Sequence, residues 1–188
     1  MRRIAACLIG LATAFSASAE SKYLESVESP VVEVPGVSVS DLASRGRLCI
    51  LKHVTYGDVV LRDESRVTPY SMPGSQAGNT TSASGGDVLQ SVDLDAGLVV
   101  ARSRVQMSSL MMRYSVESTI TFEAREGRFK ITQSAIRMAM LETGYAANNG
   151  FQPVLMQWGS PHKKVTETLQ ALATKIGECV AAPPSSDW

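Results

Sequence analysis

The sequence is poor in the side chains from which most catalytic and metal sites are built. Its 188 residues include two histidines and three cysteines. The cysteines and histidines do not form a set with the spacing of a zinc site, and no Cys-x-x-Cys pair is present for disulfide exchange. A Ser-His-Asp triad can be assembled on paper from His53 and Asp58, but no Gly-x-Ser-x-Gly elbow accompanies it. We therefore expect no enzyme activity, no cofactor and no catalytic residue, with His53 and His162 structural or solvated.

The sequence also has no excess of positive or negative charge. The chain carries 18 basic and 18 acidic side chains, whereas nucleic-acid binding needs a clustered basic face. Basic residues recur along the predicted strands, but Glu117, Glu123 and Glu126 are interleaved with them. We expect a mixed, solvated surface there and no nucleic-acid partner. The basic set is Arg102, Arg104, Arg113, Arg125, Arg128 and Lys130.

Long apolar runs are absent after the first 19 residues, and those residues have the pattern of a secretory signal. Two arginines precede an apolar stretch from Ile4 to Phe15, and Ala17-Ser18-Ala19 forms a small-residue cleavage site. The apolar stretch is too short to span a bilayer, and Cys7 lies too early in it for a lipoprotein. The sequence predicts a signal peptide at 1–19, a periplasmic or secreted protein, and no transmembrane span after cleavage.

Cleavage leaves a chain long enough for one domain, and this chain contains two cysteines, Cys49 and Cys179. It also leaves 16 basic residues against 18 acidic ones, a net charge of −2. Two thiols in an oxidising compartment most simply pair, and the alternative is two buried, inert cysteines. The loop that a disulfide would close is long, so the chain-entropy model gives a stabilisation of about 4–5 kcal/mol.

The first part of the mature chain predicts a leader, a strand and a helix. Residues 20–29 are polar and are expected to form a flexible leader. Pro30–Pro35 is a β-branched run bounded by prolines, which is typical of an edge strand. Ser38 then caps a helix that ends near His53, with Asp41 as the capping-box partner and Gly46 as a weak point. Cys49 falls on the helix face that should be buried.

The middle of the chain predicts strands around a flexible insertion. Residues 54–62 have the composition of a strand, whereas 69–86 is rich in Gly, Ser, Thr and Asn and should be an insertion with little to bury. Residues 88–93 and 98–105 then flank a tight turn, and 113–124 and 128–140 flank a second one. The apolar residues of 128–140 change parity, which predicts a bulge near Gln133-Ser134.

The end of the domain predicts a loop and a second helix. Residues 144–159 form the loop, and Ser160 caps the helix with Pro161 at its first position. Cys179 closes an apolar stripe on this helix, so a helix-to-helix disulfide is expected. The stripe is Val165, Leu169, Leu172, Ile176 and Cys179. Residues 30–182 form the predicted domain, and 183–188 a loose tail.

The order of elements predicts an α+β fold. We expect a two-layer sandwich in which an antiparallel sheet carries two helices on one face and meets water on the other. Three segments, 31–38, 88–105 and 113–138, resemble a bacterial exported family of unknown function with a TBP-like fold. The resemblance implies that fold and an exported bacterial setting, and it supplies no catalytic residue.

Methionine is the one unusual abundance. Thioethers bind Cu(I), so the alternative function is a periplasmic Cu(I)-binding protein. The candidate ligands are Met107, Met111, Met112, Met138 and Met140, with Met156 in the same half of the chain. Core packing is the favoured explanation, because methionine fills irregular gaps between strands.

These observations together predict an exported, non-enzymatic binding or envelope-structural module. Its partner is an unidentified envelope protein or ligand. The expected contact surfaces are the uncovered sheet face and the 144–159 loop, because function concentrates in loops that a rigid scaffold holds.

Overall fold

The computed structural model describes residues 22–63, 79–144 and 146–182. The predicted signal peptide, most of the predicted insertion and the predicted tail at 183–188 lie outside these residues. Two helices are present, α1 (Val39–His53) and α2 (His162–Ala181). The strands are β1 (Ser26–Glu28), β2 (Val32–Glu33), β3 (Val59–Asp63), β4 (Asn79–Ala83), β5 (Leu89–Asp93), β6 (Leu98–Ser109), β7 (Met112–Arg125), β8 (Arg128–Met140) and β9 (Gln152–Pro153).

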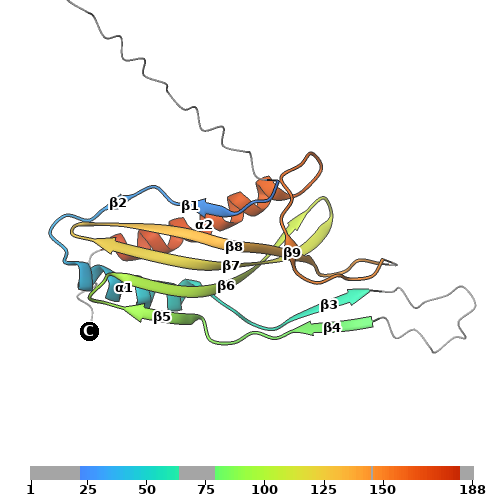
Figure 1. Ribbon diagram of the computed structural model, residues 1–188, viewed down its shortest axis with the longest axis horizontal. Coiled ribbons are helices and arrows are strands. Elements are labelled where there is room, and N and C mark those ends of the chain that lie inside the picture. Colours follow the sequence, from blue (N-terminus) through green and yellow to red (C-terminus); the bar gives the residue numbers. More distant parts are fainter. Residues whose placement is uncertain (1–21, 64–78, 145, 183–188) are drawn as a thin grey trace, which may run out of the picture.

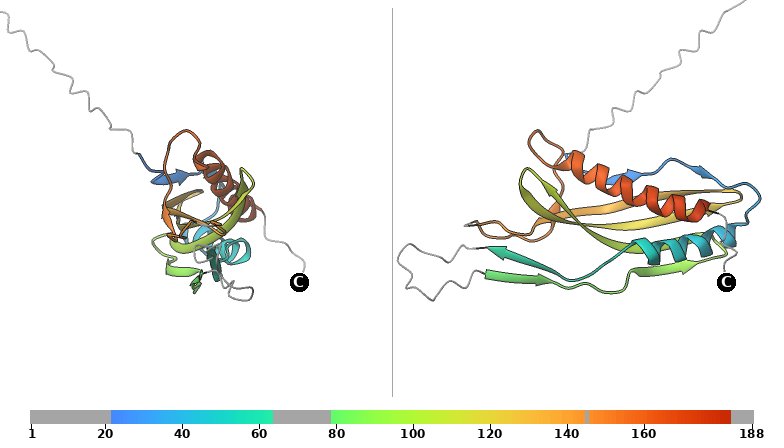
Figure 2. Two further views of the ribbon diagram at one scale, coloured as in Figure 1. Left: turned by 90° about the vertical axis from the view of Figure 1, so that its right-hand side faces the viewer. Right: turned by 180° about the vertical axis from the view of Figure 1, so that it is seen from behind.

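A seven-stranded antiparallel sheet forms one layer of the molecule (Figure 1). Its strands run in the order β1-β8-β7-β6-β5, and β2 and β9 also pair with β8. Both helices pack on the same face (Figure 2), with α1 against β6 and β7 and α2 beside it. The α+β fold with two helices on one sheet face is confirmed. β3 and β4 form a separate pair, which we call the arm, running along the lower side of the sheet in Figure 1.

The parity change in β8 comes from a β-bulge. Glu117 of β7 lies opposite Arg137, whereas Thr119, two residues later, lies opposite Ser134. Two residues of β8 therefore face one residue of β7, and the first of them, Ala135, has a φ of +51°. The bulge turns Ile136 back onto the helix-covered face, where it is buried. It lies one residue beyond the position that the sequence predicts.

The predicted flexible leader and insertion both contain strands, which corrects two expectations. β1 lies within the predicted leader and pairs with β8, because Val27 is buried against Val165 and Leu169 of α2. β4 lies within the predicted insertion and pairs with β3 over five residues. Its side chains are small and polar, but its backbone completes the hydrogen bonding of β3.

Two predicted element starts also shift. β3 begins at Val59 rather than at Val54, because residues 54–58 cross the edge of the sheet and Thr55 accepts a hydrogen bond from the Arg104 backbone there. α2 begins at His162 with Pro161 as its N-cap residue, one position later than expected. Ser160 still contacts this turn, since its hydroxyl accepts from the His162 backbone N–H at 3.4 Å.

The first helix starts as its sequence predicts. The Ser38 hydroxyl oxygen accepts a hydrogen bond from the Asp41 backbone at 3.2 Å, and the same hydroxyl donates to the Asp41 carboxylate at 2.8 Å. Gly46 faces the sheet, and a Cβ there would lie 2.7 Å from the Phe122 ring. The glycine that weakens the helix therefore lets it approach β7 closely.

A disulfide joins the two helices. Cys49 of α1 and Cys179 of α2 are bonded, with their Cα atoms 5.8 Å apart. Cys49 is buried with the residues of both helices that cover Phe122 and Phe129. The two phenyl rings are stacked with centroids 5.0 Å apart. The cross-link therefore holds both helices over the same part of the sheet.

Between the two apolar clusters of the helix-covered face lies a chain of buried polar groups. The Ser103 and Ser118 hydroxyls are 2.7 Å apart, and Ser118 donates to Gln133 Oε1 at 3.1 Å. Gln133 Nε2 in turn donates to the backbone oxygen of Leu169 at 2.6 Å. The chain runs from β6 through β7 and β8 to α2, and it satisfies each of these polar side chains inside the core.

No helix in the described ranges is long and apolar enough to cross a membrane.

Candidate interaction surfaces

The histidines occupy separate places in the fold. His53 is the last residue of α1, and His162 is the first of α2, where its Nδ1 lies 2.9 Å from the Ser160 hydroxyl. Asp58, the proposed triad partner of His53, accepts a hydrogen bond from the Gly85 backbone instead. Within the part of the chain that the structure describes, no group of three or more His, Cys, Asp and Glu residues is arranged to hold a metal ion.

The structure divides the candidate copper ligands between the core and the surface. Met107 is buried in the cluster under the first half of α2, and Met138 and Met140 pack against that cluster. Met111 and Met112 lie at the β6–β7 turn, where Met111 is 99% exposed. Met107, Met138 and Met140 therefore pack in or against the core. The expectation that Met111 and Met112 also pack in the core is wrong. The reason is the length of β6 and β7, which continue past the end of the core.

The sheet face opposite the helices is not simply a solvated surface, which corrects a further expectation. Arg104 of β6 points to this face, yet its side chain is only 6% exposed. The guanidinium donates to the backbone oxygens of Gly57 at 2.7 Å and Ala83 at 3.1 Å. It also lies against the Tyr56 ring at 4.5 Å and the Phe151 ring at 5.1 Å. Arg104 thus attaches the base of the arm and the 144–159 loop to the sheet.

Glu117 completes this buried contact. Its carboxylate accepts from Arg104 at 3.3 Å and lies 3.9 Å from Arg137 on β8. Because every donor and acceptor named here joins one part of the chain to another, the cluster works as a structural anchor. We assign it no ligand.

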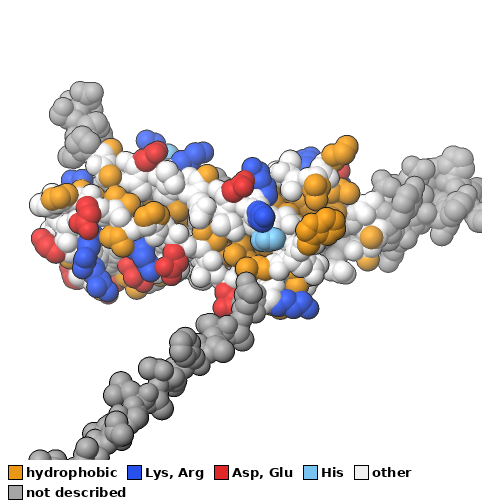
Figure 3. Space-filling model, turned by 90° about the horizontal axis from the view of Figure 1, so that it is seen from above, with side chains coloured by type: hydrophobic (Ala, Val, Ile, Leu, Met, Phe, Trp, Pro, Cys, Tyr) orange, Lys and Arg blue, Asp and Glu red, His pale blue; other side chains and the backbone are white. Residues whose placement is uncertain are grey.

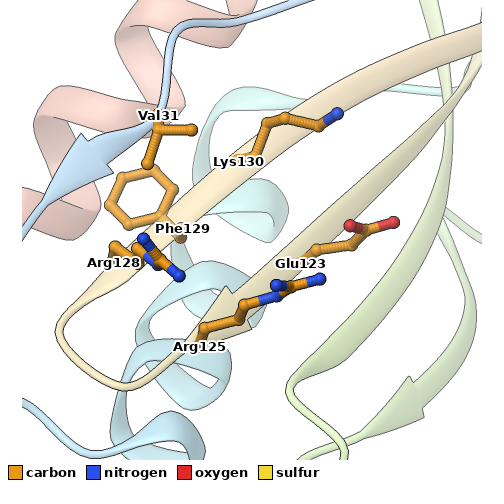
Figure 4. Close-up of a pocket in the computed structure, with 6 residues that line it drawn as sticks. All are labelled: Val31, Glu123, Arg125, Arg128, Phe129 and Lys130. Atoms are coloured by element: carbon orange, nitrogen blue, oxygen red, sulfur yellow. The ribbon is translucent and has the colours of Figure 1, made fainter. Parts of the chain in front are cut away.

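Among the hollows on the described part of the uncovered face, one lies near the β7–β8 turn. It has a volume of about 170 Å³ and backs onto the Phe129 ring (Figure 4). Arg125, Arg128 and Lys130 surround it together with Glu123. This volume is below the roughly 300–1,000 Å³ of typical small-molecule sites. A larger groove of about 660 Å³ lies beside α2 at the C-terminal end of α1, between Lys52 and Lys175.

The most distinctive surface is at the end of the molecule that carries both the β6–β7 turn and the loop before α2 (Figures 1 and 2). We call it the end surface. Trp158 is fully exposed there, Met111 is 99% exposed and Leu110 is 73% exposed. Figure 3 shows hydrophobic side chains gathered at this end, next to basic and acidic side chains and a His. The end surface consists of Tyr23, Leu110, Met111, Met112, Met156 and Trp158.

The turn in this surface has an unusual backbone. Leu110 and Met111 form a two-residue connection between Ser109 and Met112, with φ values of +50° and +65°. Positive φ at both positions defines a type I′ turn, which strongly favours Asn-Gly. Left-handed backbone costs about 1–2 kcal/mol for each ordinary side chain. Two large apolar residues therefore occupy strained positions without being buried, which is typical of residues retained for a contact.

Sequence reasoning identified only part of this surface. The 144–159 loop was expected to be a contact surface, and Met156 and Trp158 lie at its C-terminal end. The β6–β7 turn was missed, because Leu110-Met111-Met112 has the composition of a buried strand and contains no turn residue. The sequence does hold one usable signal. Two long alternating strands must be joined by a turn, and a joint with no Gly, Asn or Asp places ordinary side chains in that turn.

Comparison with known proteins supports the fold. A TBP-like protein from Parabacteroides distasonis is 9% identical in sequence and matches with a TM-score of 0.50, covering 82% of this chain and 91% of that one. The chain has a TBP-like fold. A DUF4468 family protein from Bacteroides ovatus is also similar, at 12% identity and a TM-score of 0.47, covering 85% and 88% of the two chains. No family model and no curated protein matches the sequence.

Proposed function

We propose that this protein is an exported, non-enzymatic binding module of the bacterial cell envelope that contacts its partner through the end surface. The observation that carries the proposal is the fully exposed Trp158 beside the strained, exposed Leu110-Met111 turn. Neither burial nor backbone preference accounts for these side chains, so contact with another component is the remaining physical reason for them.

The helix-to-helix disulfide and the signal-like first 19 residues support the exported location. A cystine bridge persists in an oxidising compartment and is rare in the bacterial cytosol. Because Met156 donates a backbone hydrogen bond to Lys22, the chain enters the domain beside the end surface.

Cell fractionation tests the proposal. A variant with Leu110→Asn, Met111→Gly and Trp158→Gln removes the apolar side chains and supplies the pair that a type I′ turn prefers, so we expect it to fold. It should move from the envelope fraction to the soluble exported fraction. The matched control is Leu48→Asn on α1, a residue that is 62% exposed, and it should stay with the envelope. Retention of the triple variant in the envelope would contradict the proposal.

Exposure of three thioethers at one end keeps Cu(I) binding as the second candidate function. Met111, Met112 and Met156 are all exposed, and soft ligands in exposed positions suit Cu(I). Equilibrium dialysis against Cu(I) separates the two candidates. Our proposal predicts no tight binding. Tight binding that is lost when Met111 and Met112 are replaced by Leu would favour copper instead.

A further inference from the structure

The outer edge of β6, the side away from β7, is open over the last part of the strand. Among the described residues, the last backbone bond on this edge runs from the Arg104 N–H to the Thr55 oxygen at 2.8 Å. Every second residue of an antiparallel strand directs both of its backbone groups to the same side, and β6 pairs with β7 without a register shift. Gln106 and Ser108 therefore direct their N–H and C=O groups outward as Arg104 does, and within the described ranges these groups have no backbone partner there.

The open part of this edge lacks the features that normally prevent further pairing. Proteins protect exposed strand edges with charged side chains, proline or bulges. β5 has a register shift and ends at Asp93, and β1 is short and is followed two residues later by Pro30. Residues 105–109 contain no charged residue and no proline, and β6 is regular there. Toward its C-terminal end β6 also curves away from β3 and β4 (Figures 1 and 2). This edge is therefore a template for an added strand.

Hollows flank the open edge on both faces of the sheet. On the helix side lies the groove of about 660 Å³ beside α2, where Val105 and Gln106 meet Leu172 and the end of α1. This groove exists because α1 ends at His53 while β6 and α2 continue. On the other side, Gln106 and Val60 line a hollow of about 230 Å³ next to β3. Because the side chains of a strand alternate between the two faces of a sheet, the two hollows give room for those of an added strand.

The groove beside α2 has an excess of positive charge. Lys52 and Lys175 line it, and neither forms an ion pair within the described ranges. Lys164 also lines it but is bonded to Glu167 at 3.2 Å, and Glu178, one turn beyond Lys175, lies outside the lining. The hollow on the other face is balanced in charge. Its charged residues are Asp58, Arg62, Arg113 and Glu142. Acidic side chains of an added strand are therefore favoured on the helix side.

From these observations we infer that the open edge of β6 binds an extended peptide segment of a partner protein. The segment adds a strand beside Gln106 and Ser108, and its acidic side chains, at alternate positions, point into the groove beside α2. Main-chain hydrogen bonds supply the affinity, and Lys52 and Lys175 select for acidic side chains. The site contains none of the residues that define the end surface. It therefore goes beyond the proposed function, and its failure would leave that proposal standing.

Hydrogen exchange of single amides, followed by NMR, tests the edge directly. In the free protein the amides of Gln106 and Ser108 should exchange at least about tenfold faster than those of Val105 and Met107, which point toward β7. Adding a peptide that alternates threonine and glutamate should slow the first pair and leave the second unchanged. Slow exchange of Gln106 and Ser108 in the free protein would overturn the inference, because another part of this chain or a second copy would then cover the edge.

Variants at one position separate backbone pairing from other contacts. Gln106→Pro removes one outward N–H and leaves the bonds to β7 in place, which proline allows at an open edge. Fluorescence anisotropy should show at least about fivefold weaker binding of the labelled peptide, whereas Gln106→Thr should bind as the unmodified protein does. A peptide methylated on all backbone nitrogens should bind the unmodified protein equally weakly, which tests the same bonds without altering the fold. Equal binding of the methylated and unmethylated peptides would overturn strand addition.

Charge selection has its own pair of variants. The glutamate peptide should bind about fivefold more tightly than a peptide with glutamine at the same positions, and Lys52→Gln with Lys175→Gln should abolish this difference. Arg47→Gln with Lys163→Gln is the matched control, because both side chains are exposed on the same helices but lie outside the groove lining. It should keep the difference. Equal binding of the two peptides would overturn the acidic partner, and failure of both to bind would overturn the whole inference.

Discussion

At the scale of single residues, the fold depends on one glycine that sequence reasoning treats only as a weakness. Gly46 lies in the middle of α1, where glycine costs about 1 kcal/mol relative to alanine. It is buried, and a Cβ added there would meet the Phe122 ring at 2.7 Å. The distance between α1 and the sheet is therefore set by the absence of a side chain, which no periodic pattern reveals.

Replacing Gly46 with alanine should accordingly destabilise the protein. The added methyl group forces the Phe122 ring or the helix to move, and overpacking of this kind costs about 1–3 kcal/mol, more than the gain in helix propensity. Urea unfolding followed by circular dichroism measures the change. Gly177→Ala in α2 is the matched control, because its Cβ would lie an ordinary 3.9 Å from Phe129. Gly177→Ala should be neutral or stabilising, and equal destabilisation by both variants would contradict the account.

Arg104 is the second residue whose role the sequence conceals. Its alternation along β6 places it on the uncovered face, which suggests a solvated cation. The structure surrounds it instead with backbone oxygens, two rings and Glu117. Its partners come from residues 56–57, 83–84 and 151, far from it in the sequence. A pairing of this kind depends on where the chain crosses the sheet, and local patterns do not contain that information.

At the scale of elements, Arg104 connects the arm to the sheet. Arg104→Met leaves the bonded carbonyl oxygens without their donor and leaves Glu117 with Arg137 alone, at 3.9 Å. Removing one partner of a buried ion pair costs about 3–5 kcal/mol, and we expect a loss at the lower end of this range because Arg137 remains. Hydrogen exchange should show loss of protection in β3 and β4 while β6, β7 and β8 stay protected. Arg125→Met, on the same sheet face in β7 but exposed, should leave exchange unchanged. Uniform loss of protection in all strands would show that Arg104 stabilises the whole domain rather than the arm.

The disulfide acts on the two helices together. It closes a loop with a sequence separation of 130 residues, for which the chain-entropy model gives about 5 kcal/mol. Cys49→Ser with Cys179→Ser should lower the free energy of unfolding by up to about this amount, measured by guanidinium unfolding. Adding a thiol reductant to the unmodified protein should have the same effect, and to the double variant none. A reductant effect on the double variant would show that something other than the disulfide responds.

Sequence patterns predict the elements well where burial dictates them. α1, its Ser38 cap, the stripe of α2, the long strands and the β8 bulge all follow from alternation and capping chemistry. β1 and β4 were missed because both are short. β1 buries one side chain, Val27, and β4 is held by backbone pairing with β3. The end surface was found only in part, because exposure at the end of a long hairpin depends on where the core stops.

At the scale of the whole molecule, the two ends of the sheet differ in character. One end is covered by α1, the disulfide and the stacked Phe122 and Phe129 rings. The other continues past the core into the β6–β7 turn and the loop before α2, where the apolar side chains are exposed. In the proposed function, the stable end supports the end that makes the contact. A binding module needs this combination, because a rigid scaffold reduces the ordering cost of contact.

Thiol labelling at position 158 tests this account most directly. Cys49 and Cys179 are bonded to each other, and the proposed export removes Cys7 with the signal peptide, so Trp158→Cys would introduce the single free thiol of the processed protein. A membrane-impermeant maleimide should label this cysteine rapidly in the purified protein and slowly in intact envelopes, where the end surface is covered. Leu48→Cys should label at the same rate in both preparations. Equal labelling of position 158 in the two preparations would contradict contact through the end surface.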